Sequence, residues 1–181
     1  MLLTNTQDLP VGQAQAWEAL NDIDLLRSAI PGCESITPTG DHQYELLVTA
    51  SVGPVKAKFK GKLRLDKINP PTSYTIFFEG QSGAAGHGKG NAEVRLEAVS
   101  PKQTTLHYTA QASVGGKLAQ IGSRLVDMAA QKMAADFFAA FNLRLQERYA
   151  VVVVPTAPTV AAPASSGAWA RWMAWWRRLL G

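Results

Sequence analysis

Residues 55–65 alternate strictly between basic side chains and apolar or small ones. Successive side chains on a β-strand point to opposite faces of the sheet, whereas a helix would distribute the same residues around its whole surface. The segment therefore predicts a strand with one apolar and one basic face. The apolar face carries Val55, Ala57, Phe59, Gly61, Leu63 and Leu65, and the basic face carries Lys56, Lys58, Lys60, Lys62 and Arg64.

Four further segments have the composition of strands and surround this one along the chain. They span residues 44–53, 74–80, 91–99 and 105–114, with short connections rich in Gly, Pro, Asn or Ser between them. Gly53-Pro54 marks the turn before residue 55. Consecutive strands joined by short turns predict an antiparallel meander.

Residues 117–149 change to a helical period. The segment contains no Pro, and apolar residues recur every three or four positions, at Leu118, Ile121, Leu125, Ala129, Met133, Phe137, Phe141 and Leu145. This pattern predicts one long amphipathic helix. Upstream, residues 10–32 predict two short helices, the second of them capped by Asp22 or Asp24.

The long helix is the obvious element to cover the apolar face of the sheet. A ligand cavity between the two would be lined by Phe59, Leu63, Tyr74, Ile76, Phe78, Val94, Leu96, Leu106 and Tyr108 on the strands and by Ala129, Met133, Phe137 and Phe141 on the helix. The helix also carries several small residues, such as Ala130 and Ala134. These either allow close packing in a solid core or leave room for an apolar ligand, and both interpretations stay open at this point.

Residues that usually carry catalysis are sparse in this chain. Cys33 is the only cysteine, which excludes an intrachain disulfide and fits a reducing cytoplasm. His42 and His107 have no neighbour at a metal-ligand spacing. The glycine-rich segment 80–93 lacks the spacing of a phosphate-binding loop and lies between two strands, so it predicts a flexible hairpin or a mobile gate over the cavity. We predict no catalytic group and no metal site.

The net charge of +4 is concentrated at the C-terminus. All 14 acidic residues precede residue 150, while the last 14 residues contain three arginines and no acid. Because the rest of the chain is nearly neutral, nucleic-acid binding is not predicted. The basic face of residues 56–64 is either a solvated surface or a docking surface for an acidic partner or an anionic membrane.

Three parts follow one another along the chain: a folded domain (1–149), a linker rich in Pro, Ala and Val (150–167), and an amphipathic tail helix (168–181). The tail holds four of the five tryptophans. As a helix it would be about 20 Å long, too short for the hydrocarbon core of about 30 Å, so it would lie in the membrane interface. The predicted membrane-binding residues are Trp169, Arg171, Trp172, Met173, Trp175, Trp176, Arg177, Arg178, Leu179 and Leu180. A protein partner, or the domain itself, would be the alternative surface for this helix.

Four segments of the chain together resemble one known family. They are AIPGCES (29–35), VGPVKAKFKGKLRL (52–65), GQSGAAGHGKGNAEVRL (80–96) and VGGKLAQIGSRLVDMAAQKMAADFF (114–138). Over about residues 1–145 the chain resembles the CoxG-like family of carbon monoxide dehydrogenase subunits, within the START/Bet v 1-like (SRPBCC) superfamily. The resemblance implies an α+β helix-grip fold, in which a curved seven-stranded antiparallel sheet surrounds a long C-terminal helix. Its first strand would be residues 2–9, followed by two short helices.

The resemblance also implies a function. Members of this family occur with molybdenum hydroxylase-type dehydrogenases and are implicated in attaching them to the membrane and to the quinone pool. We therefore expect a non-catalytic accessory protein that binds a lipophilic molecule, menaquinone or ubiquinone, and is peripheral on the cytoplasmic face of the membrane. The N-terminus does not resemble a signal peptide. The alternatives are a ligand-free membrane anchor or assembly factor, and a small-molecule cyclase or hydrolase of the same fold.

Overall fold

The computed structural model describes residues 1–150, which form one compact unit. Its elements are β1 (Leu2–Leu9), α1 (Gln13–Leu20), α2 (Ile23–Ala29), β2 (Cys33–Gly40), β3 (Gln43–Val52), β4 (Val55–Asn69), β5 (Ser73–Ser82), β6 (Gly86–Ser100), β7 (Gln103–Gly115), α3 (Lys117–Gln120) and α4 (Ser123–Tyr149). The predictions for residues 151–181, which include the tail helix and all but one residue of the linker, lie outside the described residues.

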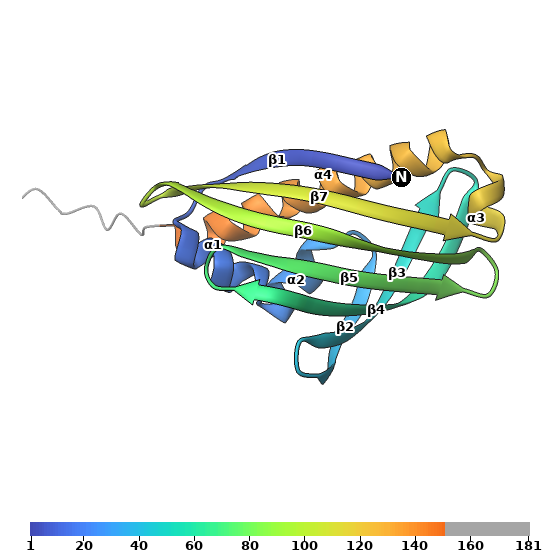
Figure 1. The fold of residues 1–181 in the computed structure, drawn as a ribbon, viewed down its shortest axis with the longest axis horizontal. Coiled ribbons are helices and arrows are strands. Elements are labelled where there is room, and N and C mark those ends of the chain that lie inside the picture. Colours follow the sequence, from blue (N-terminus) through green and yellow to red (C-terminus); the bar gives the residue numbers. More distant parts are fainter. Residues whose placement is uncertain (151–181) are drawn as a thin grey trace, which may run out of the picture. The chain divides into compact units, whose positions relative to one another are not determined.

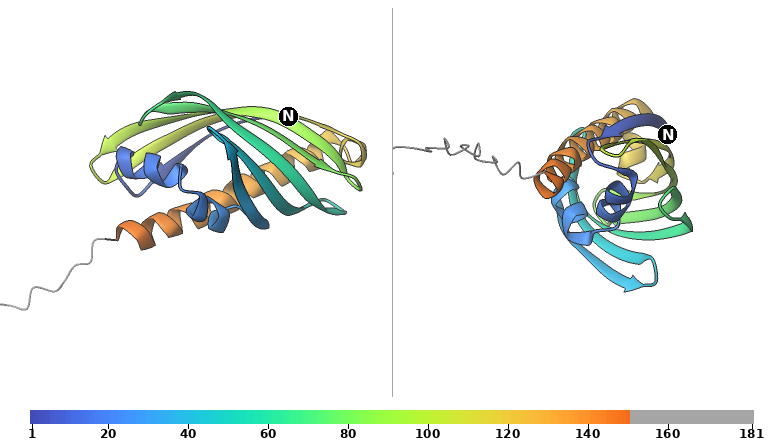
Figure 2. Two further views of the ribbon diagram at one scale, coloured as in Figure 1. Left: turned by 90° about the horizontal axis from the view of Figure 1, so that it is seen from below. Right: turned by 90° about the vertical axis from the view of Figure 1, so that its left-hand side faces the viewer.

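The seven strands form one antiparallel sheet in the order β1-β7-β6-β5-β4-β3-β2 (Figure 1). Neighbours in the sheet are also neighbours in the chain, except that β1 pairs with β7, from Leu2 opposite Gln111 to Leu9 opposite Thr104. The sheet arches over α4, while α1 and α2 lie against one end of its concave face (Figure 2). The α+β helix-grip fold predicted above is therefore confirmed.

The alternation that predicts β4 is present in the structure. From Val55 to Leu65 the apolar and small residues are partly buried and every basic residue between them is exposed. β2 was not among the predicted strands, because Pro38 and Gly40 interrupt any alternation there.

The prediction of a single helix over residues 117–149 is wrong. α3 ends at Gln120, and α4 begins at Ser123 after Gly122, whose φ of +93° is incompatible with a continuing right-handed helix. Leu118 in α3 is buried, and its amide donates to the Ala85 carbonyl oxygen at 3.0 Å. Leu125, predicted to lie on the buried face of the helix, is 41% exposed.

The glycine-rich segment 80–93 forms the predicted hairpin, and most of it lies within the two paired strands. β5 continues to Ser82 and β6 starts at Gly86, so residues 83–85 alone connect two regularly paired strands. A Cβ atom on Gly90 would lie 2.0 Å from the carbonyl oxygen of Gln111. Glycine at this position thus permits close approach of β6 and β7.

The core occupies one end of the domain. Leu9, Leu96, Leu106, Phe141 and Leu145 are fully buried where α1, α2 and the C-terminal half of α4 meet the sheet. In the N-terminal half of α4, no residue is fully buried. The helix is therefore held tightly at its C-terminal end and more loosely toward its start.

Candidate functional site

A cavity of about 360 Å³ lies between the concave face of the sheet and the helices α2 and α4. It is lined by Leu3, Leu20, Asn21, Ile23, Leu26, Ile30, Ile36, Tyr44, Leu46, Leu63, Leu65, Tyr74, Ile76, Ala92, Val94, Leu106, Tyr108, Ala110, Ala134, Phe137 and Phe138. Asn21 and the three tyrosines are the polar members of this set. The lining is therefore that of a site for an apolar molecule.

Small residues are present both in the sheet wall of the cavity and on the helix that covers it. Ile76 of β5 pairs with Ala92 of β6, which pairs with Ala110 of β7. Ala134 of α4 also lines the cavity. Larger side chains at these alanines would fill the space between sheet and helix, as Leu106 and Phe141 do in the core.

The two ends of the cavity differ in exposure. Leu20, Tyr74, Val94 and Leu106 line its closed end and are at most 8% exposed. Residues of α2, β2, β3 and α4 line the other end and are only partly buried, among them Ile30, Ile36, Tyr44 and Phe137. A ligand would therefore enter near α2, β2 and β3 and reach inward toward Tyr74.

The predicted cavity residues separate into two groups. Leu63, Tyr74, Ile76, Val94, Leu106, Tyr108 and Phe137 line the cavity, whereas Phe59, Phe78, Leu96, Ala129, Met133 and Phe141 do not. Leu96 and Phe141 belong to the packed core instead, at 1% and 0% exposure. Binding of a ligand by the first group stays a prediction.

Sequence reasoning missed the contribution of the short helices. Leu20, Ile23, Leu26 and Ile30 all line the cavity. The sequence predicted two short helices in residues 10–32, but not which part of the sheet they cover. Tyr44, Leu46 and Leu65 could have been found, because they continue the alternation of strands already predicted.

The tyrosine hydroxyls differ in their surroundings. Burial raises the pKa of Tyr74, and no hydrogen bond or neighbouring charge opposes this effect. Burial also raises the pKa of Tyr108, but there a hydrogen bond with the Asn5 side chain acts in the opposite direction. The Tyr74 ring meets Trp17 edge-on, with ring centroids 5.4 Å apart.

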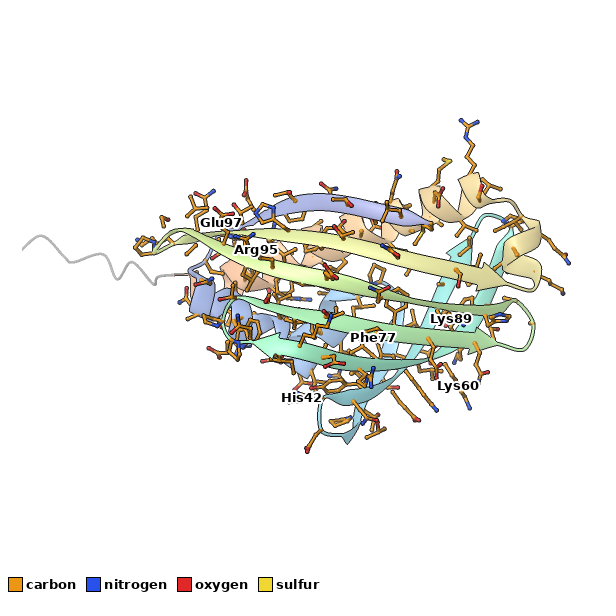
Figure 3. The ribbon with its side chains drawn as sticks, in the orientation of Figure 1. His42, Lys60, Phe77, Lys89, Arg95 and Glu97 are labelled. Atoms are coloured by element: carbon orange, nitrogen blue, oxygen red, sulfur yellow. The ribbon has the colours of Figure 1, made fainter. Side chains whose placement is uncertain are left out.

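The basic side chains of β4 lie on the opposite, outer face of the sheet. Figure 3 shows Lys60 there together with Phe77, Lys89 and Arg95. A depression of about 860 Å³ crosses this face, but it is shallow and its lining mixes Lys62, Arg64 and Lys89 with Glu45 and Glu79. Its size thus exceeds that of the cavity, yet it does not enclose a small molecule.

Neighbouring strands neutralise part of the basic face. Lys62 pairs in register with Glu45 on β3 and with Glu79 on β5. Lys58 forms a 2.8 Å ion pair with Glu34, and Arg64 lies 3.7 Å from Asp66. Lys60 lies between Leu47 and Gln81, and Lys56 lies opposite Ser51, so the excess of positive charge is at this end of β4.

The remaining chemistry-bearing residues are dispersed. His107 contacts Glu97 at 3.1 Å and Thr6 at 3.3 Å on the outer face. Cys33 is half-buried, and burial raises the pKa of its thiol. Within residues 1–150 no three His, Cys, Asp or Glu side chains are grouped as metal ligands. None of the described helices is both long and apolar enough to cross a membrane.

Comparison with protein families gives one match. The family model that describes the carbon monoxide dehydrogenase subunit known as CoxG matches residues 7–146. Among curated proteins none matches significantly.

Several solved structures share the fold. A conserved protein from Geobacillus kaustophilus superposes with a TM-score of 0.77 at 26% identity, covering 81% of this chain and 96% of the other. A START superfamily protein from Mycobacterium smegmatis gives 0.63 at 13% identity, covering 81% and 98%. The Zhui aromatase/cyclase from Streptomyces sp. R1128 gives 0.63 at 14% identity, covering 82% and 94%. At such low identity the last two establish the START/Bet v 1-like fold alone.

Proposed function

The chain belongs to the CoxG family of carbon monoxide dehydrogenase subunits, and on this premise we propose that it is a quinone-binding accessory protein of a molybdenum hydroxylase-type dehydrogenase. The domain holds the quinone, menaquinone or ubiquinone, in the cavity between sheet and helix. The tail tethers the assembly to the cytoplasmic face of the membrane. The protein itself catalyses no reaction.

The observation that carries this proposal is the apolar cavity. Its volume of about 360 Å³ is near the lower end of the range of about 300–1,000 Å³ that is usual for small-molecule sites. Such a space accommodates a quinone ring with a short stretch of prenyl chain, and the rest of a long chain would leave through the open end. Transfer of the ring from water into this lining is favoured by the hydrophobic effect.

The protein's role in electron transfer is positional. A dehydrogenase that works at the membrane surface needs its lipophilic acceptor close to its own redox centre. By excluding water from the quinone and presenting it at the docked enzyme, this domain would supply that acceptor. No residue of the chain then needs to ionise or form a covalent bond.

Docking of the dehydrogenase is assigned to the basic face of β4. Lys56 and Lys60 support this assignment, because both are exposed and neither is paired with an acidic residue on the adjacent strands. A surface of this kind attracts an acidic partner over a range set by ionic strength. The cavity opens on the other side of the sheet, so docking and ligand exchange do not compete for the same residues.

An enzyme of the same fold would need polar groups that converge inside the cavity. The lining provides three tyrosines and one asparagine, and it contains no histidine, carboxylate, lysine or cysteine. General acid–base or nucleophilic catalysis usually relies on those residues. We therefore prefer the binding function to a cyclase or hydrolase.

Native mass spectrometry of the full-length protein purified from its own membranes, followed by organic extraction, tests the proposal. We expect a quinone to co-purify with the wild type and with a variant that lacks residues 168–181. The deletion should also move the protein into the soluble fraction. An empty domain, or a lipid lost together with the tail, would favour a ligand-free anchor. Membrane retention of the deletion variant would contradict the assignment of the tail.

A further inference from the structure

Four polar side chains line the cavity, and their hydroxyl or amide groups are differently engaged. The amide nitrogen of Asn21 donates to the carbonyl oxygen of Trp17 at 2.8 Å. The Asn5 side chain acts on the Tyr108 hydroxyl and lowers its pKa, against the effect of burial. Tyr44 is only partly buried at the open end, where water can bond its hydroxyl.

Tyr74 is the exception among these four. It is 6% exposed and lines the closed end of the cavity with Leu20, Val94 and Leu106. Burial alone acts on its hydroxyl, with no hydrogen-bond partner among the described residues. A hydroxyl of a cavity-lining residue that has no protein partner is available to donate to a ligand.

We propose that the Tyr74 hydroxyl is the hydrogen-bond donor that recognises a carbonyl oxygen of the bound ligand. The inference rests on the quinone-binding function proposed above and adds the polar group that distinguishes a quinone from a hydrocarbon. The aliphatic lining binds any apolar ring of suitable size. The phenol at the closed end favours a ring that carries an acceptor at its leading edge.

The protonation state of Tyr74 fits a donor. Because burial raises its pKa further above the ordinary value near 10, the phenol keeps its proton at every physiological pH. A quinone carbonyl can only accept a hydrogen bond, so a permanently protonated hydroxyl is complementary to it. The Trp17 ring contacts the Tyr74 ring edge-on and limits its reorientation.

Tyr108 offers a matched control. Tyr74 of β5 pairs in register with Val94 of β6, which pairs with Tyr108 of β7, so both tyrosines lie in one row across the cavity wall. Tyr74→Phe and Tyr108→Phe each remove one hydroxyl and keep the ring. They differ in whether that hydroxyl already has a partner within the protein.

The test measures binding of 2,3-dimethyl-1,4-naphthoquinone and of 2,3-dimethylnaphthalene to the full-length protein by equilibrium dialysis. These probes have the same ring system and differ in the two carbonyl groups. We expect Tyr74→Phe to weaken binding of the quinone by about tenfold, as for loss of one neutral hydrogen bond in an apolar site, and to leave the hydrocarbon unchanged. Tyr108→Phe should change neither affinity appreciably.

Equal affinities of Tyr74→Phe and wild type for the quinone would overturn the inference while leaving the cavity function intact. So would an equal loss for both probes, since that indicates a packing effect. Failure of the wild type to bind either probe would overturn the proposed function together with this inference. Should Tyr74→Phe not fold, infrared spectroscopy of the wild type with carbonyl-labelled quinone decides the question: an unshifted carbonyl band on binding excludes the hydrogen bond.

Discussion

Asp22 and Arg148 join the C-terminal end of α4 to the start of α2. The carboxylate of Asp22 uses one oxygen to accept the amide of Leu25, as the N-cap of α2, and the other to accept the Arg148 guanidinium. Arg148 also bonds Glu18 of α1 at 3.0 Å. One ionic cluster thus connects three helices at the tightly packed end of the domain, adjacent to the cavity residues Asn21 and Ile23.

The ionisation of Asp22 should make the free energy of unfolding depend on pH. The Leu25 amide foremost, and then Arg148, hold the pKa of this carboxyl below its usual value. Since the native state binds the proton less readily than the unfolded chain, the contribution is complete above about pH 4 and is lost as the pH falls through the native pKa.

We expect Asp22→Ala to lower the free energy of unfolding at pH 7 by about 1–2 kcal/mol, and Asp22→Asn, which keeps a capping side chain, by less than about 1 kcal/mol. Urea unfolding between pH 7 and pH 3 checks this. The gap between wild type and Asp22→Asn should shrink as the pH falls. A gap that is independent of pH would show that the charge of Asp22 contributes nothing.

A larger side chain at Ala134 would fill the cavity, and the same substitution at Ala135 is the control. Ala134 lines the cavity, whereas Ala135 is exposed. We expect Ala134→Leu to abolish co-purification of the lipophilic ligand without a loss of stability greater than about 1–3 kcal/mol, because the added atoms enter empty space. Ala135→Leu should retain the ligand. Quinone extracted from a folded Ala134→Leu protein in wild-type amount would mean that the ligand binds elsewhere.

Phe137 and Phe141 stack on each other, with ring centroids 5.4 Å apart, yet they have different roles. Phe141 is 0% exposed and belongs to the core, while Phe137 lines the cavity. Phe141→Ala should cost about 3–5 kcal/mol of stability, whereas Phe137→Ala should cost less and mainly enlarge the cavity. Thermal and urea unfolding of the two variants compare them. Equal costs would indicate that Phe137 is a core residue as well.

Gly90 and Gly80 both lie on the concave face within the glycine-rich segment. A methyl group on Gly90 would collide with the Gln111 backbone, but on Gly80 its nearest neighbour would be 3.8 Å away. Gly90→Ala should therefore destabilise the domain by about 1–3 kcal/mol or more, while Gly80→Ala should be nearly neutral. Urea denaturation of both variants measures the difference. A neutral Gly90→Ala would contradict the close approach of β6 and β7.

Charge reversal at Lys60 and at Lys62 tests whether the basic face of β4 is a docking surface. Both belong to the basic face, but Lys62 has Glu45 and Glu79 as cross-strand neighbours and Lys60 has no acidic one. Lys60→Glu should reduce co-purification of the molybdenum-containing dehydrogenase severalfold at low salt, and Lys62→Glu should reduce it less, with both effects diminishing as salt rises. Unchanged co-purification with a Lys56→Glu/Lys60→Glu double variant would leave the basic face with a solvation role only.

The sequence on its own determined the elements whose pattern is local. The alternation of residues 55–65 predicted both faces of β4, and the period of residues 117–149 predicted the long helix that the sheet surrounds, although not its break at residues 121–122. These inferences succeed because side-chain direction follows directly from backbone geometry within a strand or helix. The resemblance to the CoxG family supplied the strand at residues 2–9, which periodicity alone did not indicate.

Only the tertiary structure decided which apolar residues enclose a cavity and which fill a core. Phe137 and Phe141 have the same place in the sequence pattern, but the first lines the cavity and the second is fully buried in the core. Likewise, the acidic neighbours of Lys62 come from strands paired with β4. Whether the Tyr74 hydroxyl finds a hydrogen-bond partner is decided by the elements that pack around it. Periodicity states which face of an element is apolar; the long-range pairing and packing of other elements decide what covers that face and how completely.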